Sequence, residues 1–211
     1  TTVSDIAKSL GMGLYKAACA GKINGKLVDL RTPVEEDCEL SILTFEDAEG
    51  KGAYWHTTSH IMAQAVKRLF PNAILAIGPS IDKGFYYDFD LETPLTPEDL
   101  IKIESEMKKI IKENLPIEKF ELEPKEAIEL MQKDNQIYKV ELINEHSSKG
   151  EKISFYRQGD FVDLCAGPHL MSTGRVKSFK LTSCTGAYWR GNSKNKMLQR
   201  VYGISFPKSS E

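Results

Sequence analysis

The pattern of apolar and polar residues in the first 45 positions has the helical period in one segment and the strand period in others. Residues 4–10 read as a short helix, and residues 38–43 alternate as a strand does. Residues 22–28 predict two strands joined at Asn24-Gly25, because both turn residues tolerate positive φ. A helix, a hairpin and a further strand in so short a stretch predict a small α+β unit.

The rest of the chain mixes longer helical patterns with strands. Residues 57–70 carry an apolar stripe of helical period that Pro71 ends. Thr96 and Pro97 predict the capped start of an amphipathic helix that runs through Ile111, and a second helix should follow Pro124. The strand-like segments are residues 73–77, 84–89, 153–156, 176–181 and 197–204. This part of the chain should form a larger mixed α+β domain.

An acidic, glycine-bearing stretch at residues 46–52 separates the two parts and is predicted to be a linker. We therefore expect a small domain over residues 1–45 and a larger domain over residues 53–211. The element order favours a β-grasp fold for the first domain, so the fold class is α+β.

Composition and charge limit the function. The chain has 211 residues, of which 41% are hydrophobic, so buried cores are expected. The net charge of −2 argues against nucleic-acid binding by bulk electrostatics alone. From Met171 onward, however, eight basic residues stand against one acid. This segment either faces phosphate or is a solvated basic surface.

The location of the protein is predicted from what the sequence lacks. It contains no run of about 18 apolar residues, and no secretory leader precedes Thr1. The four cysteines are scattered rather than closely spaced, which suits free thiols in a reducing compartment. We therefore expect a cytoplasmic protein that does not contact membranes.

Two residue pairs of equal spacing carry the candidate chemistry. His56 and His60 lie four residues apart in a predicted helix, so both imidazoles project from one face. Cys165 and His169 have the same interval on a backbone that Gly167-Pro168 keeps from being regular helix. Each pair alone has an ordinary reading, as solvated histidines or a buried thiol. Together they predict one shared site.

Two kinds of chemistry fit this quartet. Three histidines and a thiolate are a ligand set that Zn²⁺ accepts in tetrahedral geometry, and zinc lowers the pKa of bound water to about 7. Without metal, a histidine can accept or relay the proton of an attacking water. Asp163 should point to the same side as Cys165, where it could bind a substrate ammonium or cap the Gly167-Pro168 turn. The residues alone leave these alternatives open.

Four motifs in order make a family resemblance specific: residues 56–60 (HTTSH), 84–89 (GFYYDF), 163–169 (DLCAGPH) and 186–191 (GAYWRG). Together they resemble the editing domain of bacterial-type threonyl-tRNA synthetases, which is related to the editing module of alanyl-tRNA synthetases. The preceding unit is similar to the TGS domain, a β-grasp module that begins these enzymes. The resemblance covers essentially the whole chain.

The resemblance implies post-transfer editing, in which serine wrongly esterified to threonine tRNA is hydrolysed. The partners it implies are serine-charged tRNA(Thr) and the rest of the synthetase, with its class II catalytic and anticodon-binding domains. This chain lacks class II motifs, so we do not expect it to aminoacylate. The alternatives are a free-standing zinc-dependent Ala/Ser-tRNA deacylase and a non-catalytic RNA-binding module.

The resemblance also implies a site and roles for its residues. Its members are His56, His60, Lys139, Asp163, Cys165, His169 and Tyr87. His56 would orient the water or a ribose hydroxyl, Lys139 would supply positive charge near the ester, and Asp163 would bind the amine. Editing domains of the threonyl type are thought to use ordered water, so no cofactor is expected. Alanyl-type relatives use the His56, His60, Cys165 and His169 positions as zinc ligands, so Zn²⁺ remains an alternative.

A further set of residues could contact the unpaired 3′ end of the tRNA: Tyr188, Trp189, Arg190, Lys194 and Lys196. Aromatic rings stack on unpaired bases and basic side chains pair with phosphate. The alternative for Trp189 is a place in the hydrophobic core.

Overall fold

The small N-terminal domain contains the predicted helix, hairpin and further strand, together with a second helix that was not predicted. The structure is a computed structural model that describes residues 1–148 and 150–208. The elements of this domain are α1 (Val3–Leu10), α2 (Met12–Ala17), β1 (Ala18–Ile23), β2 (Lys26–Val28) and β3 (Leu40–Thr44). The strands form an antiparallel sheet in the order β2-β1-β3. Asn24 and Gly25 make the hairpin turn with φ of 48° and 80°, the conformation that this pair favours.

One long helix, α3 (Ala48–Leu69), leads from the first domain into the second. Residues 48–52, predicted to belong to a linker, instead form its first turns. Gly50 permits this, because a Cβ at that position would lie 2.0 Å from the carbonyl oxygen of Thr44. The linker prediction was therefore wrong for these residues, since two glycines and two charged residues do not prevent a helix that packs against β3.

The larger domain contains two sheets. Its elements are β4 (Ile74–Leu75), β5 (Ser80–Ile81), β6 (Gly84–Asp90), α4 (Pro97–Glu113), β7 (Ile117–Leu122), α5 (Pro124–Lys133), α6 (Ile137–Ser147), β8 (Ile153–Gln158), β9 (Phe161–Leu164), η1 (Thr173–Arg175), β10 (Ser178–Tyr188), η2 (Trp189–Gly191) and β11 (Met197–Phe206). The main sheet has the order β10-β11-β6-β4, with β5 also paired to β6, and the smaller sheet has the order β7-β8-β9. The mixed α+β prediction is confirmed.

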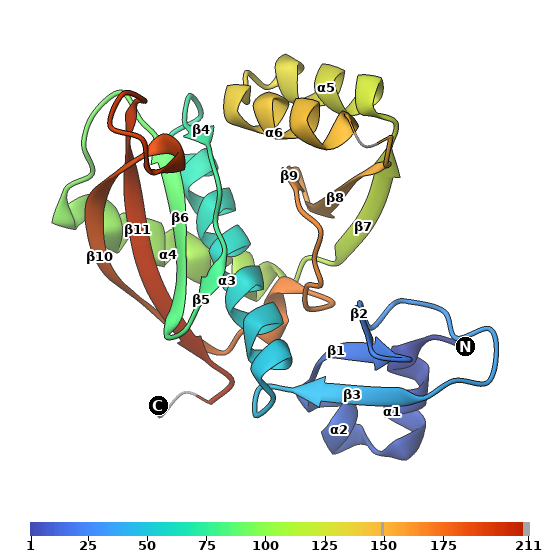
Figure 1. Cartoon of the computed structure of the whole chain (residues 1–211). Helices are drawn as coiled ribbons and strands as arrows, with labels where there is room; N and C mark the ends of the chain where they lie inside the picture. The colour runs from blue at the N-terminus through green and yellow to red at the C-terminus, as the bar shows by residue number, and fades with distance from the viewer. Residues whose placement is uncertain (149, 209–211) are drawn as a thin grey trace.

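The two sheets lie on either side of α3, with α5 and α6 above the smaller one (Figure 1). Helix α3 is therefore buried around most of its circumference, from Gly50 to Val66. Such a helix is not amphipathic in the usual sense, because it has protein on every side. This central position lets its polar residues reach both the N-terminal domain and the smaller sheet.

Most predicted elements are present, with differences at their ends. Thr96 caps α4 as predicted, and Asp99 completes a capping box with it. The strand predicted over residues 73–77 is reduced to β4, and the strand over 176–181 extends into the long hairpin of β10 and β11. Helix α6 was not predicted as a separate element, because its hydrophobic pattern is weak.

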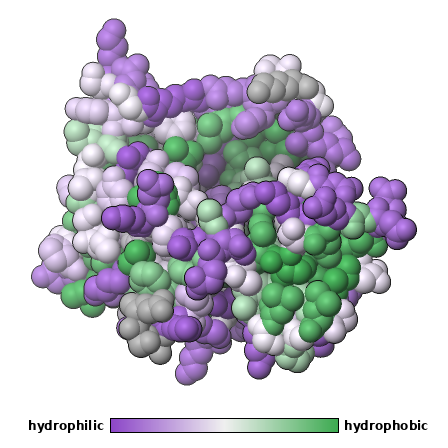
Figure 2. Space-filling model, turned by 60° about the horizontal axis from the view of Figure 1, so that its bottom comes forward, coloured by the Kyte–Doolittle hydropathy of each residue, from purple (hydrophilic) through white to green (hydrophobic). Residues whose placement is uncertain are grey.

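Figure 2 shows an apolar patch on the side where Figure 1 places the N-terminal domain. Leu10 and Met12, at the junction of α1 and α2 in this domain, are exposed large hydrophobic residues. Within the described part of the chain, we find no helix with the length and apolar character needed to span a bilayer.

Candidate functional site

Helix α3 presents His56 and His60 to the interior one turn apart. Their ring centroids lie 4.9 Å from each other, and those of His56 and His169 lie 4.5 Å apart. His60 is equally close to His169, with 4.3 Å between the ring centroids. The three imidazoles therefore form one compact cluster in which the two sequence pairs meet.

The Cys165–His169 turn follows β9 directly and folds back over α3. Cys165 Sγ lies 3.1 Å from Nε2 of His169 and 3.5 Å from Nε2 of His56. Its sulfur also accepts a hydrogen bond from the backbone N–H of Gly167 at 3.3 Å. Gly167 has φ of +77°, and a Cβ there would lie 1.9 Å from the hydroxyl of Tyr156. The turn therefore requires glycine for both conformation and space.

Thr57, inside the HTTSH motif, determines the tautomer of His169. Its hydroxyl donates to the carbonyl of Ala53 at 2.8 Å and accepts from the N–H of Leu170 at 3.0 Å. Nδ1 of His169 lies 3.0 Å from the same oxygen. Since the single hydroxyl hydrogen is directed to Ala53, Nδ1 carries the hydrogen and donates to Thr57. Nε2 of His169 is then unprotonated and faces Cys165.

A buried carboxylate network lies beside the cluster. Asp163 Oδ2 accepts a 2.6 Å hydrogen bond from the hydroxyl of Tyr87 and lies 3.5 Å from His60 Nε2. Asp163 Oδ1 lies 2.9 Å from Lys139 Nζ, on α6. Although it is close to this ammonium, Oδ1 accepts no hydrogen bond of good geometry from the described residues. Asp163 thus contacts the cluster and Lys139 rather than capping the Gly167-Pro168 turn.

Lys139 is buried, although lysine side chains are usually exposed to solvent. Only 3% of its surface is exposed, against 1% for Asp163. A lysine is rarely buried unless it is paired, and Asp163 supplies the pair. The positive charge therefore lies at a fixed place inside the domain.

These groups line one cavity of about 580 Å³ between α3, α6 and the two strands β8 and β9. Its wall includes the cluster residues His56, His60 and Cys165, together with Lys139 and Asp163. Residues 77–80 and 151–154, which include the charged Glu151 and Lys152, complete the lining. His146 is exposed and also lines this cavity.

Burial keeps the cluster uncharged. It lowers the pKa of His56 to about 4, opposed by Asp163 and assisted by Lys139. The pKa values of His60 and His169 fall well below their usual value for the same reason, helped by the neighbouring histidines. Burial also raises the pKa of Cys165 to about 12. At neutral pH the site holds three neutral imidazoles and a thiol, which can accept protons or donate electron pairs.

The donor set also fits a metal ion. One ligand atom from each of His56, His60, Cys165 and His169 can be chosen so that all four lie within 4.8 Å of one another. Tetrahedral zinc, with bonds of about 2.0–2.3 Å, needs ligand atoms separated by about 3.3–3.7 Å. The Sγ to Nε2 distances of 3.1 and 3.5 Å fall close to this range. Neutral imidazoles and a thiol that loses its proton on binding form a set that zinc accepts.

The residues predicted to contact tRNA divide into two groups. Trp189 is 6% exposed and packs against Tyr138, with its ring N–H donating to Glu141. It therefore belongs to a core cluster and offers no free face for stacking. Tyr188, Arg190, Lys194 and Lys196 are exposed on or beside the end of the β10–β11 hairpin. Two of these are engaged in ion pairs, Arg190 with Glu141 and Lys196 with Asp90.

Sequence reasoning missed three residues that contact the site from behind: Thr57, Tyr156 and Asp29. Thr57 lies within a quoted motif, so its position inside HTTSH was an available signal. Tyr156 lies in a predicted strand, without any local sign that its hydroxyl fits under Gly167. Asp29 lies in the other domain and is separated from His169 by 140 residues. No local pattern relates two such positions.

Comparison with known families identifies two domains. Residues 1–44 match the TGS domain, and residues 153–202 match the threonyl and alanyl tRNA synthetase second additional domain. The second match contains Asp163, Cys165 and His169. The chain therefore combines a TGS domain with an additional domain of these synthetases, as the motifs indicated.

Whole-chain comparison finds similarity to threonine–tRNA ligases. The chain is 61% identical to a threonine–tRNA ligase of Acetivibrio thermocellus over 210 residues, which are 100% of this chain and 33% of that protein. It is 64% identical to the enzyme of Caldanaerobacter subterraneus subsp. tengcongensis over 99% of this chain and 32% of the relative. It is 62% identical to the threonine–tRNA ligase of Clostridium tetani, over 99% of this chain and 33% of that protein.

The chain thus spans about a third of the length of these relatives. In domain content and sequence it is similar to the N-terminal third of bacterial threonyl-tRNA synthetases, which confirms the resemblance.

Proposed function

We propose that this chain hydrolyses the ester bond of threonine tRNA mischarged with serine. The supporting observation is the meeting of the HTTSH helix, Lys139 of α6 and the Asp163–His169 segment around one cavity. The similarity to threonine–tRNA ligases supports tRNA(Thr) as the tRNA of this substrate. The partners are then tRNA(Thr) and the remaining domains of a synthetase in the cytoplasm.

A second site for editing answers a physical limit on recognition. Serine is threonine without one methyl group, and a pocket built for the larger side chain distinguishes them by only about 1–3 kcal/mol. A second pocket that admits serine and excludes the extra methyl discriminates in the opposite direction. Hydrolysis there removes the serine that the first site accepted.

The geometry suits water attack on a ribose ester. Neutral His56, at the wall of the cavity, accepts a hydrogen bond from the attacking water or the neighbouring ribose hydroxyl and orients it. Lys139 provides positive charge where the carbonyl oxygen becomes negative. Asp163 Oδ1 has spare acceptor capacity and binds the substrate ammonium. Tyr87 holds the other carboxylate oxygen in place.

A metal-dependent deacylase is the second candidate, because the four ligand atoms are already gathered. His56, His60, Cys165 and His169 would hold the ion. Bound zinc would supply a Lewis acid that lowers the pKa of water to about 7. Metal analysis of protein purified without chelator, together with activity before and after dialysis against a chelator, separates the two candidates.

The decisive experiment times deacylation of four substrates by the purified chain. They are serine- and threonine-charged tRNA(Thr), and serine- and alanine-charged tRNA(Ala). Selective cleavage of serine from tRNA(Thr) supports editing. Preference for tRNA(Ala) favours the alanyl-type deacylase, and tRNA binding without cleavage of any ester favours a binding module.

Substitutions in the cavity test the assigned roles. We expect His56→Ala and Lys139→Ala each to slow serine release by about 100- to 1000-fold, the usual cost of losing such a group. Lys125→Ala, on the exposed face of α5, is the matched lysine control and should cleave at the wild-type rate. Unchanged rates in both cavity variants would refute the assignment.

A further inference from the structure

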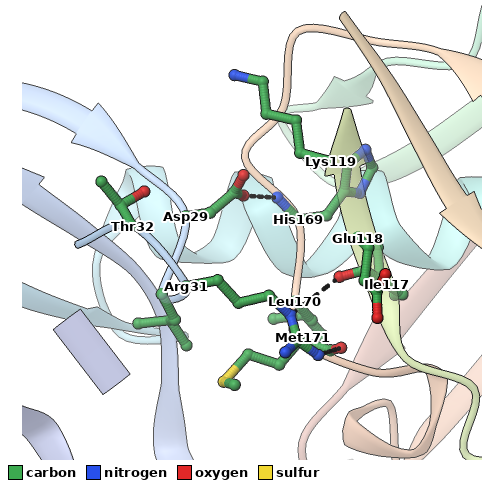
Figure 3. Close-up of a pocket in the computed structure, with 10 residues that line it drawn as sticks. Asp29, Arg31, Thr32, Ile117, Glu118, Lys119, His169, Leu170 and Met171 are labelled. Carbon is green, nitrogen blue, oxygen red and sulfur yellow. Dashed lines mark hydrogen bonds between the residues drawn. The ribbon is translucent and has the colours of Figure 1, made fainter. Parts of the chain in front are cut away.

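The N-terminal domain forms part of the wall behind His169. Asp29, which directly follows β2, points across the domain boundary toward the backbone of His169 (Figure 3). Its Oδ1 accepts a hydrogen bond from the backbone N–H of His169 at 2.9 Å. Its Oδ2 accepts one from the hydroxyl of Tyr156 at 2.6 Å. One carboxylate of the first domain therefore binds two groups of the second.

Tyr156 in turn fixes the ring of His169. The two rings meet edge to face with 4.4 Å between their centroids. The Tyr156 hydroxyl occupies the space that a side chain at position 167 would need. Burial, and then the charge of Asp29, raise the pKa of Tyr156, so the hydroxyl remains a donor to the carboxylate. Asp29 thereby acts on both the backbone and the flank of His169.

His169 is consequently held from three directions. Thr57 binds Nδ1, Tyr156 packs against the ring, and Asp29 binds the backbone N–H. These contacts leave Nε2 directed at Cys165 and the histidine cluster. Hydrogen bonds to a charged acceptor are stronger than neutral ones, and their loss leaves buried donors without a partner.

We propose that Asp29 of the TGS domain is a positioning residue of the hydrolytic site, which it serves by fixing His169 through its backbone N–H and through Tyr156. The kinetic test of this inference rests on the proposed function, because it measures ester hydrolysis. It gives the small domain a specific task in hydrolysis, in addition to any contact with tRNA.

Arg31 provides an internal comparison, because it crosses the same boundary without touching His169. Its guanidinium donates to the carbonyls of Ile117 and Met171 at 3.2 and 3.0 Å, on the other side of a 390 Å³ interdomain pocket (Figure 3). Removing Arg31 therefore weakens the domain contact and leaves the Asp29 bonds in place. A general effect of domain association and a specific effect on His169 can thus be separated.

The kinetic test uses the intact chain and serine-charged tRNA(Thr). We expect Asp29→Ala to lower kcat by about 10- to 100-fold, as outer contacts to a functional histidine usually do. KM should change by less than about twofold, since substrate binding is retained. Asp29→Asn keeps an acceptor for the His169 N–H and should recover most of the rate. Asp37→Asn, an exposed aspartate of the same domain, is the matched control.

Two further variants test the route. Tyr156→Phe should lower kcat less than Asp29→Ala does. The double variant Asp29→Ala with Tyr156→Phe should lower kcat by less than the product of the two single fold-changes, because both residues act through His169. A rise in KM at unchanged kcat would assign Asp29 to tRNA docking and overturn the proposal. So would an equal loss of kcat in Arg31→Ala.

A second readout is independent of catalysis. In the wild-type chain, the ring nitrogen resonances of His169 should show the Nδ1–H tautomer, and its backbone amide should exchange slowly. Asp29→Ala should shift these resonances toward averaged tautomers and speed that exchange, whereas Asp37→Asn should change neither. Unchanged resonances and exchange would refute the positioning role. If the wild-type chain cleaves no ester, the proposed function fails, and these resonances still decide whether Asp29 positions the ring.

Discussion

Lys139 in the cavity and Arg190 on the β10–β11 hairpin are both basic side chains paired with carboxylates, but their surroundings differ. Lys139 and its partner Asp163 are 3% and 1% exposed. Arg190 pairs with Glu141 and Glu145 where 37% of its side chain, and about half of each glutamate, meets solvent. Water screens the second group and is excluded from the first. Two ion pairs of similar chemistry are therefore expected to contribute very differently to stability: the buried one strongly, the exposed one weakly.

The basic segment from Met171 onward illustrates the same difference. Several of its cations are already bound to groups from other parts of the fold: Arg175 to the carbonyls of Tyr15 and Lys16, Lys180 to Glu104, Lys196 to Asp90 and Arg200 to Asp88. The charge excess counted along the sequence is thus partly neutralised in space. The comparison between buried and exposed charge can be tested in four ways.

Among single substitutions, the largest effect is expected from removing one member of the buried pair. Lys139→Met leaves Asp163 charged and unpaired in the interior, which costs about 3–5 kcal/mol of the free energy of unfolding. Urea denaturation measures the loss. Lys125→Met, at an exposed position of α5, should change stability by less than about 0.5 kcal/mol.

The double variant Lys139→Met with Asp163→Leu should recover much of that stability, because no buried charge remains. If the single Lys139 variant is as stable as the wild type, the pair does not have the buried character described above.

The second effect is a loss of stability in acid. The pKa of His56 is lowered to about 4, and the pKa values of His60 and His169 are also lowered. Below about pH 6.5 the unfolded chain binds protons at these histidines that the folded chain does not. Stability should therefore be complete above that pH and fall as the pH drops toward 4, by about 1.4 kcal/mol per pH unit for each histidine.

Urea unfolding between pH 7 and pH 5 checks this slope, with chelator present so that metal release does not contribute. His56→Gln should reduce the slope by about one histidine's share. A free energy of unfolding that stays constant over this range would contradict the assignment of neutral, buried imidazoles.

The third effect is small by comparison. Arg190→Ala removes the exposed ion pairs with Glu141 and Glu145 and should lower the free energy of unfolding by less than about 1 kcal/mol. The difference should shrink further at high ionic strength, because salt screens exposed charges. Unfolding curves at low and high salt measure it. A loss as large as that of Lys139→Met would show that exposure does not distinguish the two pairs.

The smallest effect concerns tRNA. Lys194 is exposed and forms no ion pair with the described residues. Its replacement by alanine should weaken tRNA binding slightly and reduce the slope of log affinity against log salt by less than about 1. Lys125→Ala is the control at an exposed lysine of α5. An equal effect in both variants would show that the end of the β10–β11 hairpin is not part of the tRNA-binding surface.

Local sequence patterns predicted much of the fold because its elements carry their own signals. The Asn24-Gly25 hairpin and the Thr96 capping box depend on residues within a few positions of each other. Residues 48–52 were misassigned because local glycine and charge favour a loop, whereas packing against β3 favours helix. Helix α6 escaped prediction for a related reason, since its burial comes from distant parts of the chain.

The site was predictable to the extent that its motifs recur in a known family. The equal spacing of His56–His60 and Cys165–His169 indicated one shared centre, and the family resemblance added Lys139 and Tyr87. Residue type alone would have placed Lys139 in solvent. Its ion pair with Asp163 is a tertiary contact between α6 and β9, so no local pattern could reveal it.

The sequence by itself determined the two-part α+β organisation, the residue pairs and the resemblance to threonyl-tRNA synthetases. The tertiary structure alone decided that Trp189 is buried, that Thr57 fixes the tautomer of His169, and that Asp29 reaches that histidine from the other domain. The reason is physical: periodicity and turn chemistry act over a few residues, whereas burial, protonation and positioning depend on which distant groups the folded chain brings within hydrogen-bond distance.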